Sequence, residues 1–125
     1  MKNIRKILAA LLVLATLLSV CGCKKKPNEQ VIEKEYVVYH FRNNELLESH
    51  YKKHGVDMGF KSKEEYESAA CDVINNKDAL HKLEKEDGDD VYYVEKTNEF
   101  VILSTDGYIR TYFLPDKGKE YYDKQ

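Results

Sequence analysis

The stretch VYYVEKTNEFVILSTDGYIRTYF, residues 91–113, decides the fold. Runs rich in valine, isoleucine, tyrosine, phenylalanine and threonine alternate within it with the short polar segments TNE and TDG. Such runs are typical of strands, and a few polar residues between them are enough for a hairpin turn. We therefore expect an antiparallel meander. Its predicted strands are residues 91–96, 100–104 and 108–114, preceded by a weaker strand at residues 81–86.

A first amphipathic helix is predicted from Asn44, a plausible cap, to Gly55, a residue that commonly ends helices. Its positions i, i+1, i+4, i+5 and i+8 form one stripe, occupied by Leu46, Leu47, His50, Tyr51 and His54. Both histidines should therefore face the rest of the protein.

A second helix is predicted after Ser62, because the sequence Ser-Lys-Glu-Glu is a capping box in which Ser62 and Glu65 each satisfy a free backbone N–H. Its narrow apolar stripe consists of Tyr66, Ala69, Ala70, Val73 and Ile74. Cys71 falls beside this stripe and is expected to be a half-buried small residue without a catalytic role.

Both helices precede the strong strands, so we predict an α+β fold with two N-terminal helices packed on a small antiparallel meander sheet of about four strands. Alternation along the last strand places Ile109, Thr111 and Phe113 on one face, with the residues between them on the other. Residues 36–41 are a candidate short strand, and residues 118–125 are expected to be a polar tail.

The N-terminus has the pattern of a bacterial lipoprotein signal peptide, predicted to span residues 1–22. Three basic residues lie within the first six, and residues 7–20 carry no charge. Fourteen residues are too few to cross a bilayer, which takes roughly 20. Gly22 before Cys23 resembles a lipobox better than Val20 before Cys21 does, so Cys23 is the predicted lipidated first residue of the mature protein.

Residues 23–35 are then a tether and residues 36–125 a single domain, exported and held at the outer side of the cell membrane through its lipid anchor only. Cys71 would be its one free thiol, and no internal disulfide is available. Removal of the signal leaves 17 basic against 22 acidic residues, a net charge near −5. That charge argues against a protein that binds nucleic acid non-specifically through electrostatic attraction to phosphate groups.

His50 and His54, one helical turn apart, allow three interpretations: buried core residues, a metal clamp or an acid-base pair. The segment HYKKH lacks the glutamate of the helical zinc-protease motif, and the spacing of His40 and His81 does not require either as a third ligand. The acidic run at residues 84–90 lacks the ligand order of an EF-hand, which favours a solvated turn. No metal or other cofactor is predicted.

An acid-base pair would suffice for RNA cleavage without a metal, given a cation and hydroxyl groups nearby. The chain also resembles a known family over residues 40–125. The segments that carry the resemblance are HFRNNELLESHYKKHGVDMGFKSKEEYESAA (40–70), TNEFVILSTDGYIRTYF (97–113) and the terminal YYDKQ. They are similar to the C-terminal toxin modules of bacterial polymorphic and contact-dependent inhibition systems, which belong to the barnase, EndoU, colicin and RelE ribonuclease (BECR) group.

This resemblance implies a metal-independent endoribonuclease whose substrate is RNA, with tRNA among the candidates, and whose partner is a cognate immunity protein. It implies His50 and His54 as proton-transfer groups and Lys53 as the neighbouring cation. Ser104, Arg110 and Thr111 would line the site from the sheet. The alternative is a surface lipoprotein that uses the same scaffold for binding and catalyses nothing, an interpretation favoured by the acidic charge and the export signal.

Overall fold

The computed structural model describes residues 32–125, of which Glu35–Gln125 form one unit. The expected signal peptide, Cys23 and most of the tether therefore lie outside the described residues. Among the helices of residues 32–125, none has the length and apolar character needed to cross a membrane.

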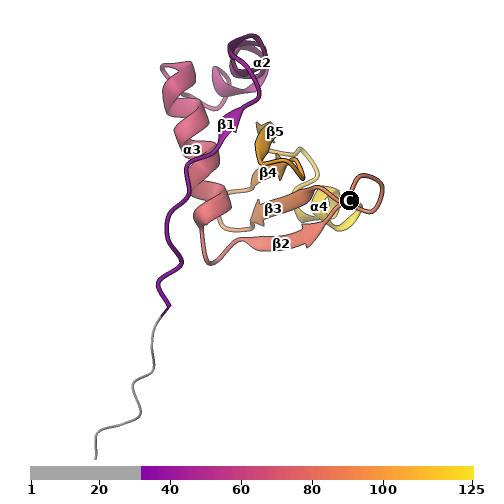
Figure 1. Ribbon diagram of the computed structural model, residues 1–125. Coiled ribbons are helices and arrows are strands. Elements are labelled where there is room, and N and C mark those ends of the chain that lie inside the picture. The colour runs from indigo at the N-terminus through magenta and orange to yellow at the C-terminus, as the bar shows by residue number, and fades with distance from the viewer. Residues whose placement is uncertain (1–31) are drawn as a thin grey trace, which may run out of the picture. The chain divides into compact units, whose positions relative to one another are not determined.

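The sheet has five strands in the order β1-β5-β4-β3-β2 (Figure 1). The predicted antiparallel meander is confirmed, and its strands are β2 (Leu80–Leu83), β3 (Asp90–Val94), β4 (Glu99–Leu103) and β5 (Tyr108–Phe113). The fifth strand, β1 (His40–Phe41), is the end of the candidate strand at residues 36–41 and pairs in parallel with the start of β5. The fold is α+β, and the sheet is mixed.

The first predicted helix is observed as α2 (Asn44–His50), followed by a π-helical turn, η1 (Tyr51–Gly55). Its cap is Asn43, one residue earlier than expected, since the side chain of Asn43 accepts a hydrogen bond from the Leu46 N–H. A π turn has one extra residue per hydrogen-bonded ring and is frequent at functional sites.

The second predicted helix is α3 (Lys63–Asn75), and Ser62 caps it by accepting a hydrogen bond from the Glu65 N–H. The Glu65 carboxylate accepts from the Lys61 N–H and not from that of Ser62, so the capping box is only half formed as predicted. The predicted polar tail contains a third helix, α4 (Lys119–Asp123). Its tyrosines pack on the sheet, which explains why this segment is ordered.

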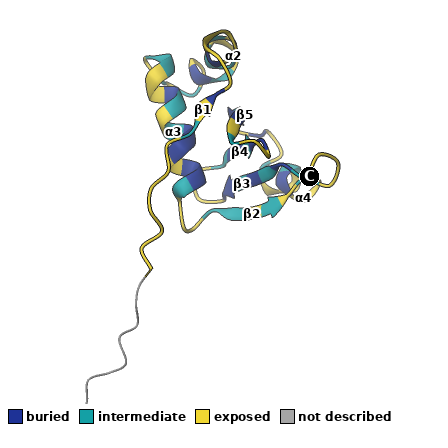
Figure 2. Ribbon diagram, in the orientation of Figure 1, coloured by how far each residue is buried: buried dark blue, intermediate teal, exposed yellow. Residues whose placement is uncertain are grey.

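The sheet packs with α3 in one apolar cluster and with α4 in another. Figure 2 marks the buried residues along α3 and the strands. In the larger cluster, Tyr66 of α3 is fully buried, stacks on Tyr112 at 5.0 Å between ring centroids and donates a hydrogen bond to the Tyr112 carbonyl. In the smaller cluster, Tyr122 of α4 stacks on Tyr93 at 5.7 Å. Aromatic pairs in this range contribute about 0.5–1.5 kcal/mol beyond their buried area.

The predicted face assignment along β5 is wrong, because a β-bulge interrupts the strand. Ile102 lies opposite Thr111, whereas Leu103 lies opposite Ile109, so Arg110 is an extra residue. The alternation of side chains changes phase at the bulge. Thr111 and Phe113 therefore share a face, but Ile109 lies on the other one.

The larger cluster consequently takes Ile109 and Tyr112 from β5, both almost completely buried beneath α3. Phe113 lies opposite Phe100 and belongs with the cluster of α4. Phe113 is thus directed away from the α3 core, at a part of β5 that β1 does not cover.

The segment before β1 runs beside α3 (Figure 1). The Asn75 amide exchanges two hydrogen bonds with the backbone of Val37, and Cys71 Sγ does the same with the backbone of Tyr39. Cys71 is buried, and this burial raises the pKa of its thiol. The thiol is therefore a hydrogen-bonded structural residue, more buried than expected.

Candidate active site

The π turn η1 fixes the position of His54. The Val56 N–H donates to the Tyr51 carbonyl over 3.0 Å, which closes the wider turn. Gly55 is buried against two rings, and a Cβ at this position would lie 2.5 Å from Cδ2 of Tyr51 and 2.8 Å from Cδ2 of Tyr66. The turn packs this closely on α3 because Gly55 has no side chain, and η1 also contacts β5.

His54 is partly buried and stacks on Phe113, with 5.2 Å between ring centroids and 24° between ring planes. Its pKa is lowered, chiefly by burial and then by the charge of Lys53, while Asp57 acts in the opposite direction. The neutral imidazole is therefore the main form at neutral pH. A neutral imidazole can accept a proton, which is what a general base does.

His50 lies one turn earlier, between Phe41 at 5.2 Å and His54 at 6.0 Å. Its Nδ1 atom is buried without a hydrogen-bond partner, and its pKa is lowered by burial, then by His54 and Lys53. A protonated imidazole would have to find partners for two N–H groups. The site thus favours a neutral His50 that supports the ring of His54, and it offers His50 little as a proton donor.

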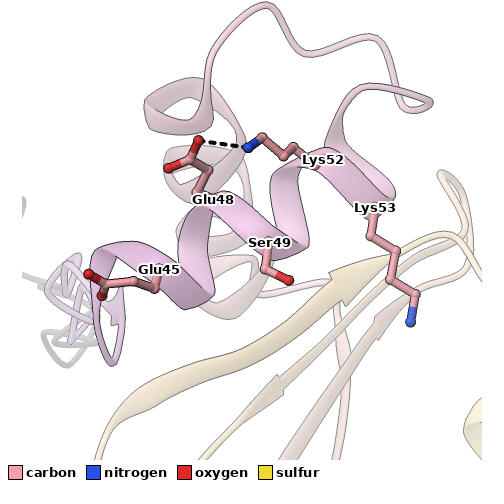
Figure 3. Close-up of a pocket in the computed structure, with 5 residues that line it drawn as sticks. All are labelled: Glu45, Glu48, Ser49, Lys52 and Lys53. Carbon is pink, nitrogen blue, oxygen red and sulfur yellow. Dashed lines mark ion pairs between the residues drawn. The ribbon is translucent and has the colours of Figure 1, made fainter.

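The two lysines between the histidines differ in their contacts. Lys52 Nζ forms an ion pair with Glu48 at 2.9 Å, whereas Lys53 extends in the other direction (Figure 3). Lys53 is exposed, and no ion pair of Lys53 is found within residues 32–125. It borders both a broad, open hollow of about 620 Å³ along α2 and a smaller pocket beside His54.

This smaller pocket, the His54 pocket, has a volume of about 260 Å³. It combines one cation, one imidazole, two carboxylates and three apolar side chains. The lining residues are Lys53, His54, Asp57, Met58, Phe113, Leu114 and Asp116. The last five of these residues were not predicted from the sequence, although Asp57 follows His54 by three residues. No sequence pattern marks Asp116 or Phe113 as a site residue, because both reach the pocket only through the packing of η1 on β5.

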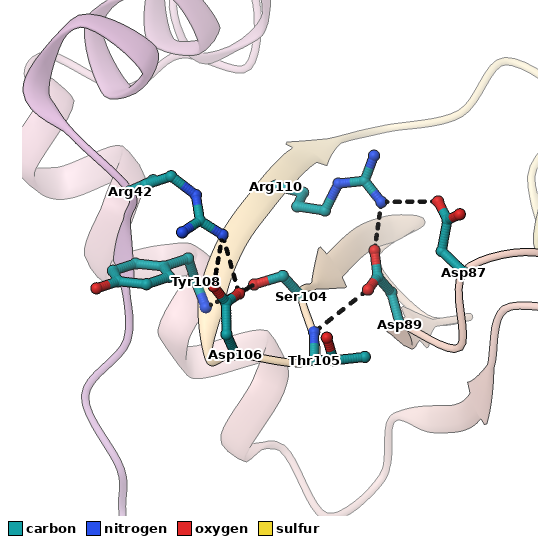
Figure 4. Close-up of polar contacts among 8 residues, drawn as sticks. All are labelled: Arg42, Asp87, Asp89, Ser104, Thr105, Asp106, Tyr108 and Arg110. Atoms are coloured by element: carbon teal, nitrogen blue, oxygen red, sulfur yellow. Dashed lines mark hydrogen bonds and ion pairs between the residues drawn. The ribbon is translucent and has the colours of Figure 1, made fainter.

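Ser104 and Arg110 belong to a different set of contacts (Figure 4). Ser104 Oγ donates to Asp106 Oδ1 at 2.5 Å and accepts from the Tyr108 N–H at 2.9 Å, so its hydroxyl holds the β4–β5 turn. Arg42 pairs with the same Asp106 and lies over the Tyr108 ring at 4.4 Å. These contacts link the loop before α2 to the turn.

Arg110, the bulge residue, pairs with Asp89 and, at 3.2 Å, with Asp87 (Figure 4). Asp89 also accepts a hydrogen bond from the Thr105 N–H, and its side chain is only 6% exposed. Arg110 therefore neutralises a buried carboxylate. Oxygen atoms of Glu84, Asp87 and Asp89 lie within 4.8 Å of one another, but Arg110 already binds two of these three groups.

The structure thus brings His50, His54 and Lys53 together and separates them from Ser104. Ser104 accepts a hydrogen bond from Tyr108, the first residue of β5, whereas Phe113 is the last residue of β5, and five residues of strand span roughly 17 Å. Thr111 is intermediate, since it shares the face of Phe113 two residues earlier.

We expect Arg110→Met to lower the free energy of unfolding by about 2 kcal/mol, because the buried Asp89 carboxylate loses its ion-pair partner. Removing one partner of a buried pair costs about 3–5 kcal/mol, and the value is reduced here because the Arg110 side chain is 49% exposed. Urea unfolding measures the effect. Asp87→Asn is the matched control, with a cost below about 0.5 kcal/mol because Asp87 is 57% exposed. Unchanged stability in Arg110→Met would contradict this structural role of Arg110.

Acidification is expected to destabilise the domain through both site histidines. Their pKa values are lowered in the folded state, so the unfolded chain binds more protons than the folded protein once the pH drops to about 6.5. The free energy of unfolding therefore decreases as the pH decreases. Each histidine contributes at most about 1.4 kcal/mol per pH unit, and nothing above about pH 7.5. The free energy of unfolding, measured in urea, should differ less between pH 7.5 and pH 5.5 in His50→Gln than in the wild type. An equal difference would contradict the role of His50.

Comparisons with known proteins find similarity among solved structures. No protein-family model matches the chain, and no curated protein sequence matches it. Among solved structures, the chain is similar to a ribonuclease from Escherichia coli complexed with its inhibitor protein, with a TM-score of 0.49 and 23% sequence identity. The match covers 62% of this chain and 95% of that chain.

Proposed function

We propose that this protein is a metal-independent endoribonuclease of the toxin type, exported and tethered to the membrane by a lipid on Cys23. The observation that carries the proposal is the His54 pocket. There a partly buried imidazole with a lowered pKa adjoins the exposed Lys53, and the cavity that both residues line also includes the Phe113 ring. This set supplies a base and a cation, the two groups that RNA cleavage without a metal needs most.

In the proposed reaction, His54 removes the proton from a ribose 2′-hydroxyl. The oxygen then attacks the adjacent phosphorus, a 2′,3′-cyclic phosphate forms, and the bond to the 5′-oxygen of the next nucleotide breaks. Lys53 stabilises the charge on the phosphorane, and its ammonium group is the proton donor that the pocket offers to the leaving oxygen. Phe113 holds the imidazole plane through the ring stack.

The sequence supports the same proposal through its resemblance to the BECR toxin modules, which places His50, Lys53 and His54 in one motif. On this basis tRNA is a candidate substrate and a small immunity protein a candidate partner. The acidic net charge predicted for the mature form argues against general attraction to nucleic acid and favours the alternative of a binding module.

Cleavage of RNA by the purified protein in the presence of a chelator tests the activity. Mixed tRNA and a short end-labelled RNA are the substrates, and products with 2′,3′-cyclic phosphate ends are expected. If a folded wild-type protein leaves both substrates intact, the enzyme proposal fails. The alternative of a binding module on a surface lipoprotein would then be the one to pursue.

The lipid anchor is tested independently of the activity. Mass spectrometry of protein extracted from the membrane fraction should show an N-terminal diacylglyceryl cysteine at Cys23, and Cys23→Ser should release the protein from that fraction. An unmodified N-terminus downstream of Cys23 would exclude the anchor and leave the ribonuclease proposal standing.

A further inference from the structure

We propose that Tyr121, in the C-terminal helix α4, is a positioning residue that holds the Phe113 ring against His54. The inference rests on the proposed function for its reaction, in which His54 is the base. The terminal segment YYDKQ carries part of the resemblance to the toxin modules, and its residues 121–123 belong to α4. The proposed reaction gives this segment no role.

Phe113 is the ring that connects α4 to His54. One of its neighbours is His54, stacked at 5.2 Å between ring centroids and 24° between ring planes. Another is Tyr121, which meets Phe113 edge to face at 5.5 Å and 75°. Tyr121 does not line the His54 pocket, so its effect on His54 has to pass through Phe113.

A third ring, Phe100, completes the group. It is fully buried and lies 5.2 Å from Phe113 and 5.0 Å from Tyr121. Phe113 is only partly buried and is the last residue of β5, at a part of the strand that β1 does not cover. Phe100 and Tyr121 supply two of the three aromatic contacts of Phe113 found within residues 32–125, and they restrict its side chain to the rotamer that stacks on His54.

The helix that carries Tyr121 is fixed by contacts outside the pocket. Tyr122 stacks on Tyr93 at 5.7 Å, and the Tyr93 hydroxyl donates to Asn98 Oδ1 at 2.7 Å. The Asn98 amide donates to the Pro115 carbonyl at 3.0 Å, in the loop between β5 and α4. The backbone around Tyr121 is therefore anchored to β3 and to the turn that follows it.

The test follows His54 directly and does not require activity. NMR records the chemical shifts of the His54 ring protons against pH in the wild type and in Tyr121→Leu, with the signals assigned through His54→Gln. Leucine keeps apolar volume in α4 but offers no ring to Phe113. With this support lost, His54 becomes less buried, so its pKa should rise toward about 6.5 and its ring protons should lose the shift caused by the stack. An unchanged pKa with unchanged shifts would overturn the inference.

No charge around His54 changes in this variant. The titratable groups near it are Lys53 and Asp57 on its own turn, His50 in α2 and Asp116 after β5. All of them remain in Tyr121→Leu, so a change in the pKa of His54 reports its burial.

Tyr122→Leu is the matched control, since it makes the same change at the next residue of α4. Tyr122 is more buried than Tyr121 and packs on Tyr93, so the loss of stability should be at least as large, whereas the His54 signals should stay in place. Tyr121→Phe keeps the ring and should behave as the wild type. Tyr121→Met replaces Tyr121→Leu if the leucine variant does not fold. Equal displacement of the His54 signals by Tyr122→Leu would show that loosening of the whole helix is the cause, and the inference would fail.

A double-mutant cycle tests whether Phe113 transmits the effect. Phe113→Leu removes the stack directly, so it should raise the pKa of His54 by itself. Tyr121→Leu should add no further change in this background. A further change as large as the one in the wild-type background would contradict the role of Phe113 and overturn the inference.

Cleavage then separates this inference from the proposed function. If His54 is the base, Tyr121→Leu should cleave RNA at least about tenfold more slowly, since a misplacement of about 1 Å can cost about 10²-fold, and the acidic limb of kcat/KM should move with the pKa measured by NMR. His54 signals that respond as expected in a protein that cleaves no RNA would support the positioning role and remove the catalytic proposal. Histidine-dependent cleavage that is unchanged in Tyr121→Leu would keep the ribonuclease and remove the positioning role.

Discussion

His54→Gln is expected to lower the rate of RNA cleavage by about 10²–10⁴-fold, the usual contribution of a positioned general base. Glutamine keeps a planar amide near Phe113 but cannot take up a proton at neutral pH. Because His54 is only partly buried, we expect the free energy of unfolding to change by less than about 1 kcal/mol. Single-turnover cleavage of a labelled RNA and urea unfolding measure the two quantities.

The pH dependence gives a second readout for the same residue. Burial lowers the pKa of His54, so the acidic limb of the kcat/KM profile should lie below about pH 6.5. His50→Gln is the control, because it removes the neighbouring ring but not the proposed base. It should cost less than about tenfold in rate. Equal losses in the two variants, with both folds intact, would show that the histidines act as a pair.

Much of the fold was predictable because its signals are local. Residues close together in the sequence determine the cap at Ser62, the apolar stripe of α3 and the hairpin turns of the meander. Each of these features appears where it was predicted. The bulge at Arg110 has no such signal, since it depends on how β4 and β5 align. The packing of α4 was hidden because its tyrosines find their partners only across the sheet.

The candidate site was predictable only in part for the same reason. The placement of His54 and Lys53 follows from helical spacing, which the sequence displays. Asp116 comes from a loop after the last strand and reaches the pocket only because η1 packs on β5. Conversely, the resemblance implied that Arg110 lines the site, but the buried carboxylate of Asp89 binds it.

Gly55→Ala is expected to destabilise the domain by about 2 kcal/mol and to impair cleavage as well. Alanine favours a helix over glycine by about 1 kcal/mol, so propensity alone predicts stabilisation. The new methyl group, however, would lie 2.5 Å from Tyr51 and 2.8 Å from Tyr66. Tyr66 is fully buried and hydrogen-bonded to the carbonyl of Tyr112, which leaves its ring no room to move. Overpacking of this kind costs typically 1–3 kcal/mol, and more where the neighbours cannot move.

The steric origin of this effect can be isolated with a double-mutant cycle. Tyr51→Ala removes the closer ring, so it should destabilise the Gly55→Ala protein less than it destabilises the wild type, with a coupling energy of about 1 kcal/mol. Because the π turn carries His54 onto Phe113, the relief should also restore part of the cleavage rate. A Gly55→Ala protein as stable as the wild type would show that helix propensity outweighs the contact. The position of His54 would then have to be fixed by its stack on Phe113 alone.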